Sequence, residues 1–325
     1  MPRLGSISGG RFVGARRALS AWIARDTSDL SSTEVSKLAI ERKLNGGTLR
    51  HGVIATVVAI LPPVALSAGV FFVLAELHPL LGLAWNIVAL YFLMGFRRFS
   101  HAYNDIQVAL KTADIAGARR ALSAWIARDT SDLSSTEVSK LAIERGLLDS
   151  YRHVFATLFW FILLPGPSGA VMYRTSALLA NEWRRNARGI GTKPIIHARA
   201  VFDRPAQWLL WLLDWVPVRL TALSFAIVGD FEDAAFCWRT QANSWAEQEG
   251  GEHAGIVLAS GAGALGVMLG GPMPIAGGDR DYRPDLGLNE EPDADLLPSA
   301  VGLVWRALIL WLLLMLLLTL ANWAP

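Results

Sequence analysis

The chain has 325 residues, of which 53% are apolar and 18% are charged, and its net charge is only +2. A soluble domain of this length does not bury so large an apolar fraction, so the composition indicates a membrane protein and excludes disordered and collagen-like classes. The single cysteine, Cys237, excludes an internal disulfide framework, and the small net charge gives no support for a nucleic-acid partner. We therefore expect a lipid bilayer as partner and no nucleic acid.

Three uncharged runs predict membrane-spanning helices. Residues 52–75 form a 24-residue run, long enough to cross about 30 Å of hydrocarbon at about 1.5 Å per residue. Within it Pro62 and Pro63 remove two backbone donors, which predicts a kink. Residues 80–96 are expected to return across the bilayer, and residues 307–323 form the last span.

Three further runs have mixed signals. Residues 154–173 are uncharged but interrupted at 165–167 (PGP), which predicts a re-entrant hairpin or a strongly kinked span. Residues 206–229 contain Asp214 and Arg219. Residues 254–278 are uncharged and rich in glycine and alanine, which is typical of a segment packed closely against other helices.

The distribution of basic residues predicts the orientation of the connecting segments. Residues 1–52 hold nine Lys and Arg, residues 97–153 hold nine and residues 174–205 hold seven, whereas 230–253 and 279–306 are dominated by acids. Basic connections stay on the cytoplasmic side, so the first three segments are expected inside and the last two outside. By the same rule the runs 154–173 and 254–278 do not cross completely.

An exact repeat occupies two places in the chain. Residues 14–42 recur without a change at 117–145, which indicates a recent duplication or an artefact of the gene model. Each copy reads as a helical hairpin: Ala118, Leu122 and Trp125 share one helical face, and Ser134 with Glu137 forms a capping box that opens a second helix.

These patterns predict an all-α, multi-pass integral membrane protein with a cytosolic helical hairpin and no sheet of consequence. Residues 1–43 are interpreted as the duplicated cytosolic segment. Residues 44–325 are interpreted as the membrane domain, with a cytosolic helical insert at 97–153.

From residue 44 onward the chain resembles the CobD/CbiB family of cobalamin-biosynthesis membrane proteins, and in places its AmpE-like branch. The resemblance runs through roughly 280 residues in the family's order. It is carried by the stretches 50–52 (RHG), 95–98 (GFRR), 128–130 (RDT), 142–144 (AIE), 158–160 (LFW), 213–220 (LDWVPVRL), 264–266 (ALG) and 269–272 (LGGP).

The resemblance implies a multi-pass protein of the bacterial inner membrane that is associated with cobalamin biosynthesis. Enzymes of the family are adenosylcobinamide-phosphate synthases, which use ATP to join adenosylcobyric acid to an aminopropanol moiety. No cofactor is expected here unless that reaction is retained, in which case ATP and magnesium are implied. The resemblance is compatible with a corrinoid or other small-molecule ligand and with an oligomer.

The chain departs from the family pattern at several acidic positions. Residues 148–149 (LD) and 152–153 (RH) stand where the family has Glu-Asn and Asp-Gly, and residues 177–180 (ALLA) replace Asn-Thr-Leu-Asp. The acidic pair expected before the VPVR stretch is part of residues 210–213 (LWLL). Because these acids are missing, an AmpE-like, non-catalytic regulatory protein is the alternative to an ATP-dependent amide-forming ligase.

The candidate site residues come from the cytosolic segments and from the charged pair in run 206–229. We expect Asp214 and Arg219 to pair or to face a wet cavity, because isolated charges in hydrocarbon are costly, and we expect Pro217 to break the helix between them. The alternative is that the run 206–229 lies partly at the membrane interface and that both side chains are solvated. No catalytic residue is assigned, and the six scattered histidines give no metal-ligand spacing, so no metal site is predicted. The candidate ligand-binding residues are Arg97, His101, Arg128, Asp129, Thr130, Glu144, Asp214 and Arg219.

Three functions of different classes remain open from the sequence. The first is a cobalamin-pathway membrane enzyme or a degenerate relative of one, and the second is an AmpE-like regulator. The third is a transporter that uses the Asp214 and Arg219 region together with broken helices.

Overall fold

The computed structural model describes residues 49–187, 203–248, 250–274, 280–288 and 290–323. The chain divides into two compact units, one made of residues 1–62 and 178–207 and the other of residues 63–177 and 208–325. The repeat copy at 14–42 and the predicted boundary at residue 43 lie outside the described residues.

The first two predicted spans are present as helices. Helix α3 (Leu49–Leu77) continues through Pro62 and Pro63, and α4 (Pro79–Met94) follows after a single residue. His78 caps α4, since its Nδ1 accepts a hydrogen bond from the backbone N–H of Leu80 at 3.2 Å. Gly82 lies against Ala75: a Cβ there would be 3.1 Å from the Ala75 Cβ. The tight turn therefore depends on a small residue at this position.

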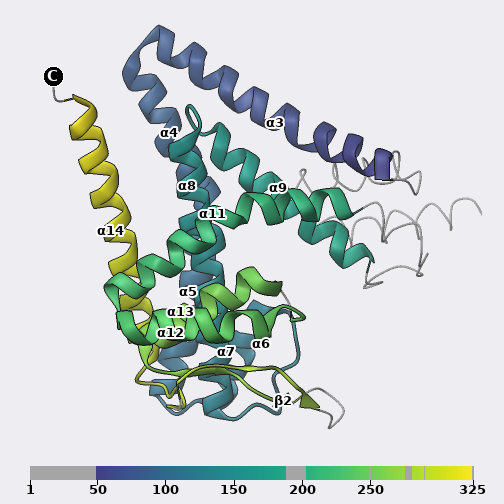
Figure 1. Ribbon diagram of the computed structural model, residues 1–325, viewed down its shortest axis with the longest axis vertical. Helices are drawn as coiled ribbons and strands as arrows, with labels where there is room; N and C mark the ends of the chain where they lie inside the picture. The colour runs from purple at the N-terminus through teal and green to yellow at the C-terminus, as the bar shows by residue number, and fades with distance from the viewer. Residues whose placement is uncertain (1–48, 188–202, 249, 275–279, 289, 324–325) are drawn as a thin grey trace, which may run out of the picture. The chain divides into compact units, whose positions relative to one another are not determined.

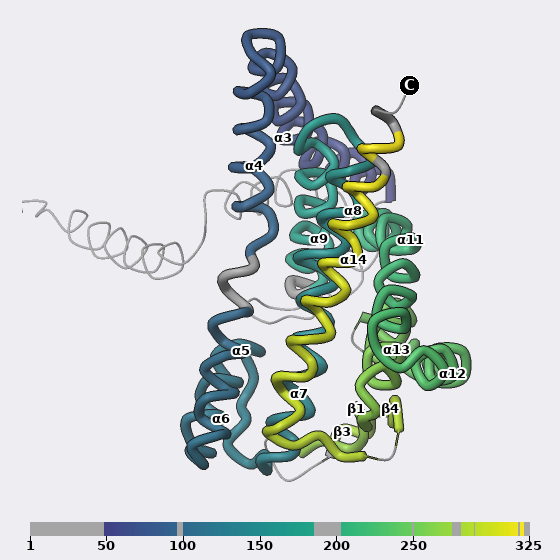
Figure 2. The backbone as a smooth tube through the Cα atoms, turned by 90° about the vertical axis from the view of Figure 1, so that its left-hand side faces the viewer, coloured from purple at the N-terminus to yellow at the C-terminus, as the bar shows by residue number. Residues whose placement is uncertain are grey.

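The helical hairpin predicted at 117–145 is confirmed, and one more helix precedes it. Helix α5 (Phe96–Lys111) leads into α6 (Ile115–Ile126) and α7 (Ser135–Ser150). The capping box of Ser134 and Glu137 is present, with both reciprocal hydrogen bonds formed. Helix α7 packs against α13 and α14 as well as α5 and α6, and Figure 2 shows α14 running down to the level of α7.

The break predicted in the run 154–173 is also confirmed. A π-helical turn, Tyr151–Phe155, continues α7 into α8 (Ala156–Leu163), and α9 (Ser168–Ala187) starts after the PGP sequence. Gly166 has φ +63°, a left-handed conformation that an L side chain rarely adopts. The three residues 165–167 therefore turn the chain between two helices.

Helix α11 (Arg204–Val228) corrects one expectation, because Pro217 lies inside a continuous helix and does not break it. Proline has no N–H, so the carbonyl of Leu213, four residues earlier, lacks its helical donor. The indole Nε1–H of Trp160 on α8 donates to that carbonyl at 3.1 Å. A side chain from a neighbouring helix thus replaces the missing backbone hydrogen bond.

This replacement gives a testable double-mutant cycle. Trp160→Phe leaves the buried carbonyl without a donor and is expected to lower the free energy of unfolding by about 1–3 kcal/mol. In a Pro217→Ala background the new backbone N–H can reach the same carbonyl, so the same substitution should cost at least about 1 kcal/mol less. Unfolding in detergent micelles measures the four free energies, and equal costs in the two backgrounds would contradict this role of Trp160.

The described residues of 231–287 form two helices, a 3₁₀ turn and two short antiparallel ribbons. Helix α12 (Phe231–Gln241) leads through a 3₁₀ turn, Ala242–Trp245, into the buried α13 (Gly251–Leu265). Antiparallel pairs join β1 (Met268–Gly270) to β4 (Asp285–Gly287) and β2 (Met273–Pro274) to β3 (Arg280–Asp281). The fold class is all-α with these two small ribbons, as Figure 1 shows.

Glycines explain the close packing predicted for the run 254–278. A Cβ on Gly255 would lie 2.2 Å from the carbonyl oxygen of Ala242, and one on Gly263 would lie 2.5 Å from that of Asp233. Helix α13 therefore approaches the backbone of its neighbours, which only glycine permits at these positions.

Three of the described helices are long and apolar enough to cross a bilayer: α3, α11 and α14 (Leu297–Trp323). Helix α4 is apolar but has only 16 residues. Exposed leucines cover α14, including Leu313, Leu316 and Leu320. Such faces are stable in hydrocarbon and unfavourable in water, so the chain is a membrane protein.

Candidate functional site

A polar cavity of about 200 Å³ lies between α7, α13 and the connections around the β ribbons. Its walls come from segments far apart in the sequence: the start of the α6–α7 loop, one face of α7 with the π-helical turn, the end of the 3₁₀ turn and the β3–β4 loop. The lining residues are Ile126, Arg128, Leu141, Glu144, Arg145, Leu148, Arg152, Trp245, Gln248, Leu258, Asp281 and Arg283.

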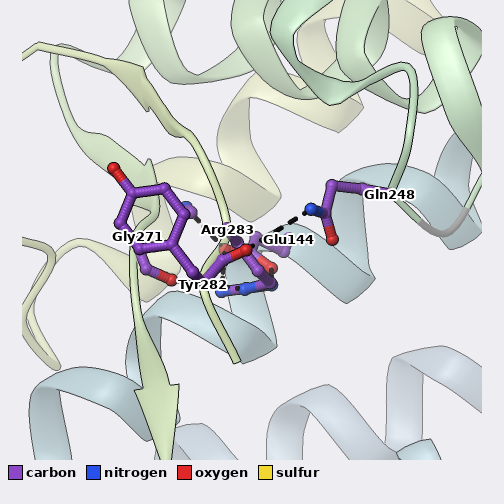
Figure 3. A network of polar contacts seen from close by, with 6 residues as sticks. Glu144, Gln248, Gly271, Tyr282 and Arg283 are labelled. Atoms are coloured by element: carbon purple, nitrogen blue, oxygen red, sulfur yellow. Dashed lines mark hydrogen bonds and ion pairs between the residues drawn. The ribbon is translucent and has the colours of Figure 1, made fainter. Parts of the chain in front are cut away.

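A buried ion pair forms part of the cavity wall. The Arg283 guanidinium binds both carboxylate oxygens of Glu144, with Nη1–Oε2 at 2.7 Å and Nη2–Oε1 at 3.1 Å, as Figure 3 shows. The backbone N–H of Gly270 donates to the same carboxylate at 2.8 Å. Both side chains are at least nine-tenths buried. Since its two oxygens are occupied by three donors, Glu144 holds the β ribbons onto α7.

Glycine conformations place Arg283 against Glu144. In the β1–β4 ribbon Gly270 pairs with Asp285, and Gly270 and Gly271 have φ values of +74° and +77°. A Cβ on Gly270 would lie 2.0 Å from the carbonyl oxygen of Pro284, so no larger residue fits. The guanidinium also lies 5.4 Å from the Trp245 ring centroid, and Gln248 donates to the carbonyl of Tyr282 at 3.5 Å (Figure 3).

The cavity wall carries more positive than negative charge. Four arginines face two carboxylates there, and Arg283 is already paired with Glu144. Arg145 pairs with Asp149 at 3.1 Å, and the indole of Trp125 donates to the same carboxylate at 3.0 Å. Among the ion pairs of the described residues, none involves Arg128 or Arg152. Arg128 Nη2 donates to the carbonyl of Pro274 at 3.3 Å, and its remaining N–H groups, with those of Arg152, have no carboxylate partner among the described residues and can bind an anion.

The position of Arg152 depends on the π-helical turn. This turn inserts an extra residue into the α7–α8 helix, which rotates the side chains that follow it. Glu144, Leu148 and Arg152 nevertheless lie four residues apart and line one cavity. Such turns are frequent at functional sites, and this one carries a cavity arginine.

Two of the predicted site residues, Arg128 and Glu144, line this cavity. Their neighbours Asp129 and Thr130 stabilise the turn before α7. The Asp129 carboxylate accepts from the backbone N–H of Ser131 at 3.0 Å, which lowers the pKa of Asp129, and the Thr130 hydroxyl donates to the carbonyl of Arg119 at 2.7 Å. We therefore assign Asp129 and Thr130 to the turn.

Arg97 and His101 lie on α5. The side chain of Arg97 is outside the described part of the structure. His101 is exposed on the helix surface. Of the two, His101 does not line the cavity.

Asp214 and Arg219 do not meet, which corrects the expected pairing. They are five positions apart on a continuous helix, so their side chains point about 140° apart. The Asp214 carboxylate is buried and accepts hydrogen bonds from the hydroxyls of Tyr151 and Tyr173. Arg219 points the other way, where it lies 4.3 Å over the Trp215 ring and 3.8 Å from Glu252. The pair therefore belongs to two different environments.

Beside Arg219, His253 stacks on Trp211 with an interplanar angle of 13° and is buried. Burial lowers the pKa of His253 from 6.5, Arg219 lowers it further, and Glu252 opposes the shift. The unfolded chain then takes up a proton near pH 6.5 that the folded chain does not, so stability should fall as the pH drops below about 6.5.

His253→Gln removes this titration, and we expect it to make the free energy of unfolding less dependent on pH between 6.5 and 5. Unfolding in detergent at several pH values, with the parent and the variant side by side, measures the two slopes. Identical slopes would show that His253 does not contribute to the acid sensitivity.

Sequence reasoning missed Arg145, Arg152 and Arg283 as site residues. The spacing of Glu144, Leu148 and Arg152 is a signal that places them on one helix face. No comparable signal links Glu144 to Arg283, because they are 139 positions apart. Their contact also corrects the expected orientation: it joins the segment 97–153, expected inside, to the segment 279–306, expected outside, so both lie on one side of the membrane.

Comparisons with known proteins identify relatives of this architecture. The family model described as CobD/Cbib protein matches residues 39–184. No solved structure matches the chain.

Curated relatives cover most of the chain. A protein named cobalamin biosynthesis protein CobD from Stutzerimonas stutzeri is 38% identical over 285 residues, covering 85% of this chain and 86% of the relative. One with the same name from Chromobacterium violaceum is 36% identical and covers 79% of this chain and 76% of the relative. Cobalamin biosynthesis protein CbiB from Salmonella typhimurium is 25% identical, with 74% and 72% covered.

Proposed function

The chain belongs to the CobD/CbiB family, and on that premise we propose that it acts in cobalamin biosynthesis as a synthase-type protein that binds a phosphate-bearing reactant in the arginine cavity. In this proposal it is a multi-pass protein of the bacterial inner membrane. The reaction is the ATP-dependent joining of a corrinoid acid to an aminopropanol moiety, which the resemblance to the family implies.

The excess of arginine on the cavity wall is the observation that carries the proposal. Guanidinium groups match phosphate oxygens with paired hydrogen bonds, and a partly enclosed site strengthens each contact relative to water. Arg128 and Arg152 are the groups we assign to the anion, while the Glu144–Arg283 pair keeps the wall rigid. Apolar Leu141, Leu148 and Leu258 would exclude water from the bound group.

Magnesium does not fit the cavity as the residues are arranged. This ion needs several oxygen ligands, and the carboxylates in the lining are Glu144 and Asp281. Both oxygens of Glu144 already accept from Arg283, and Gly270 adds a third donor. Among the described residues no group of three His, Cys, Asp or Glu side chains is placed to hold a metal. We therefore assign no step of the reaction to a metal in this cavity.

An AmpE-like regulatory role is the second candidate. It is favoured by the fact that two carboxylates near the cavity are already paired. Glu144 is held by Arg283, and Asp149 is held by Arg145 and Trp125. Neither carboxylate is free to take a proton from an attacking amine. A protein of this kind would bind the anionic ligand and signal its presence without chemistry.

Growth of a bacterial strain that lacks its own adenosylcobinamide-phosphate synthase separates the two candidates. If the protein carries out the reaction, its expression should restore cobalamin-dependent growth on cobyric acid. Absence of growth, with the protein present in the membrane and still able to bind pyrophosphate, would reject the enzyme and leave the regulatory candidate. Absence of both growth and binding would reject both.

A further inference from the structure

Helix α11 carries a row of tryptophans on its outer face. Trp208, Trp211 and Trp215 recur at intervals of three and four residues and are 63%, 46% and 45% exposed. The opposite face, which includes Leu213 and Thr221, is buried. The outer face continues with aliphatic side chains: Leu212, Val216, Leu220, Leu223 and Ile227.

Length and hydropathy alone make this helix a membrane span, but its middle is poorly suited to hydrocarbon. Arg219 and Glu252 form a loose ion pair at 3.8 Å, and their side chains are 33% and 43% exposed. In a helix that crosses the bilayer, Arg219 would lie near the centre, where a charged side chain costs at least about 2.5–3.5 kcal/mol. An exposed ion pair at that depth is not expected, whereas it is stable among headgroups and water.

Contacts with α14 place α11 at the edge of the bilayer. The Trp311 indole donates to the Ser224 hydroxyl at 2.8 Å, and Trp311 stands four residues after the start of the apolar run 307–323. Figure 1 shows residues 208–228 of α11 crossing α14 at a steep angle. In that view they separate the apolar helices α4 and α8 from α5, α7, α12 and α13. This segment therefore runs along the level at which α14 enters the membrane.

We propose that residues 208–228 of α11 lie in the plane of the membrane–water interface, with the tryptophan row inserted between phospholipid headgroups and acyl chains. Tryptophan favours this zone because its ring is largely apolar and its N–H needs a polar partner. Arg219, stacked on Trp215, stands in the same row and can reach lipid phosphate. This inference does not rest on the proposed reaction.

Measured depth along the helix tests the proposal. In a full-length Cys237→Ala background, nitroxide labels are attached to single cysteines, and the protein is reconstituted into vesicles of phosphatidylcholine and phosphatidylglycerol. Oxygen, which concentrates in the bilayer, and a nickel complex, which stays in water, each speed up the relaxation of a label. The ratio of the two effects gives the depth of that label. The labelled variants are Trp208→Cys, Leu212→Cys, Val216→Cys, Leu220→Cys, Leu223→Cys and Ile227→Cys, and the controls on α14 are Ile309→Cys, Leu313→Cys, Leu316→Cys and Leu320→Cys.

The six labels on α11 should all report one shallow depth, about 5–10 Å below the headgroups and within about 5 Å of one another. The α14 labels should change depth by about 1.5 Å per residue, which shows that the method resolves a span. A depth that rises to a maximum near Val216 and falls towards both ends would overturn the proposal in favour of a span. Labels that the nickel complex reaches as in free solution would overturn it in favour of a surface outside the membrane.

Discussion

Replacing Glu144 with alanine is expected to lower the free energy of unfolding by about 3–5 kcal/mol, because the change leaves the Arg283 guanidinium buried without its counter-ion. The substitution also removes the acceptor of the Gly270 N–H, so the β1–β4 ribbon loses an attachment to α7. Unfolding in detergent micelles, followed by tryptophan fluorescence, measures the loss.

The matched control removes both charges. The double variant Glu144→Met, Arg283→Met replaces the ion pair with apolar side chains of similar size. We expect it to be more stable than either Glu144→Met or Arg283→Met alone. If the two single costs simply add in the double variant, the two side chains do not act as a pair and the proposed wall of the cavity is wrong.

Arg152→Ala is expected to weaken the binding of pyrophosphate by about 10-fold to 100-fold, because one charge-assisted contact to an anion contributes about 1.5–3 kcal/mol. No ion pair of the described residues includes this side chain, but its charge interacts with the buried Asp214, so the free energy of unfolding of the variant is measured alongside binding. Calorimetric titration of the purified protein in detergent measures the affinity.

Arg120→Ala is the control for net charge. Arg120 is exposed on α6, where its Nε donates to the carbonyl of Ala116, and it does not line the cavity. Both variants lose one positive charge, so only a local contact distinguishes them. An equal loss of affinity in the two variants would assign binding to the general field of the protein and not to the cavity.

Local signals in the sequence were sufficient for most of the helices. The uncharged run at 52–75 predicted α3, the PGP sequence predicted the break between α8 and α9, and Ser134 with Glu137 predicted the start of α7. Each depends on residues a few positions apart, because hydrogen bonding and hydrophobic periodicity act over one or two helical turns.

Features that depend on distant partners were not accessible in this way. Pro217 remains inside a helix because Trp160 supplies the missing donor to the carbonyl of Leu213, which is 53 positions further along the chain. Glu144 contacts Arg283 because two short ribbons fold back onto α7. The Asp214–Arg219 pairing was wrong because it assumed a broken helix, and a continuous one separates the two side chains.

The central claim, that the arginine cavity is where this protein acts in cobalamin biosynthesis, is tested most directly by two charge reversals in the synthase-deficient strain. Arg152→Glu places a carboxylate in the cavity, and Arg120→Glu makes the same change outside it, with both proteins brought to equal amounts in the membrane. The account predicts that the wild-type chain and Arg120→Glu restore growth on cobyric acid and that Arg152→Glu does not. Growth with Arg152→Glu equal to growth with the wild-type chain would contradict it.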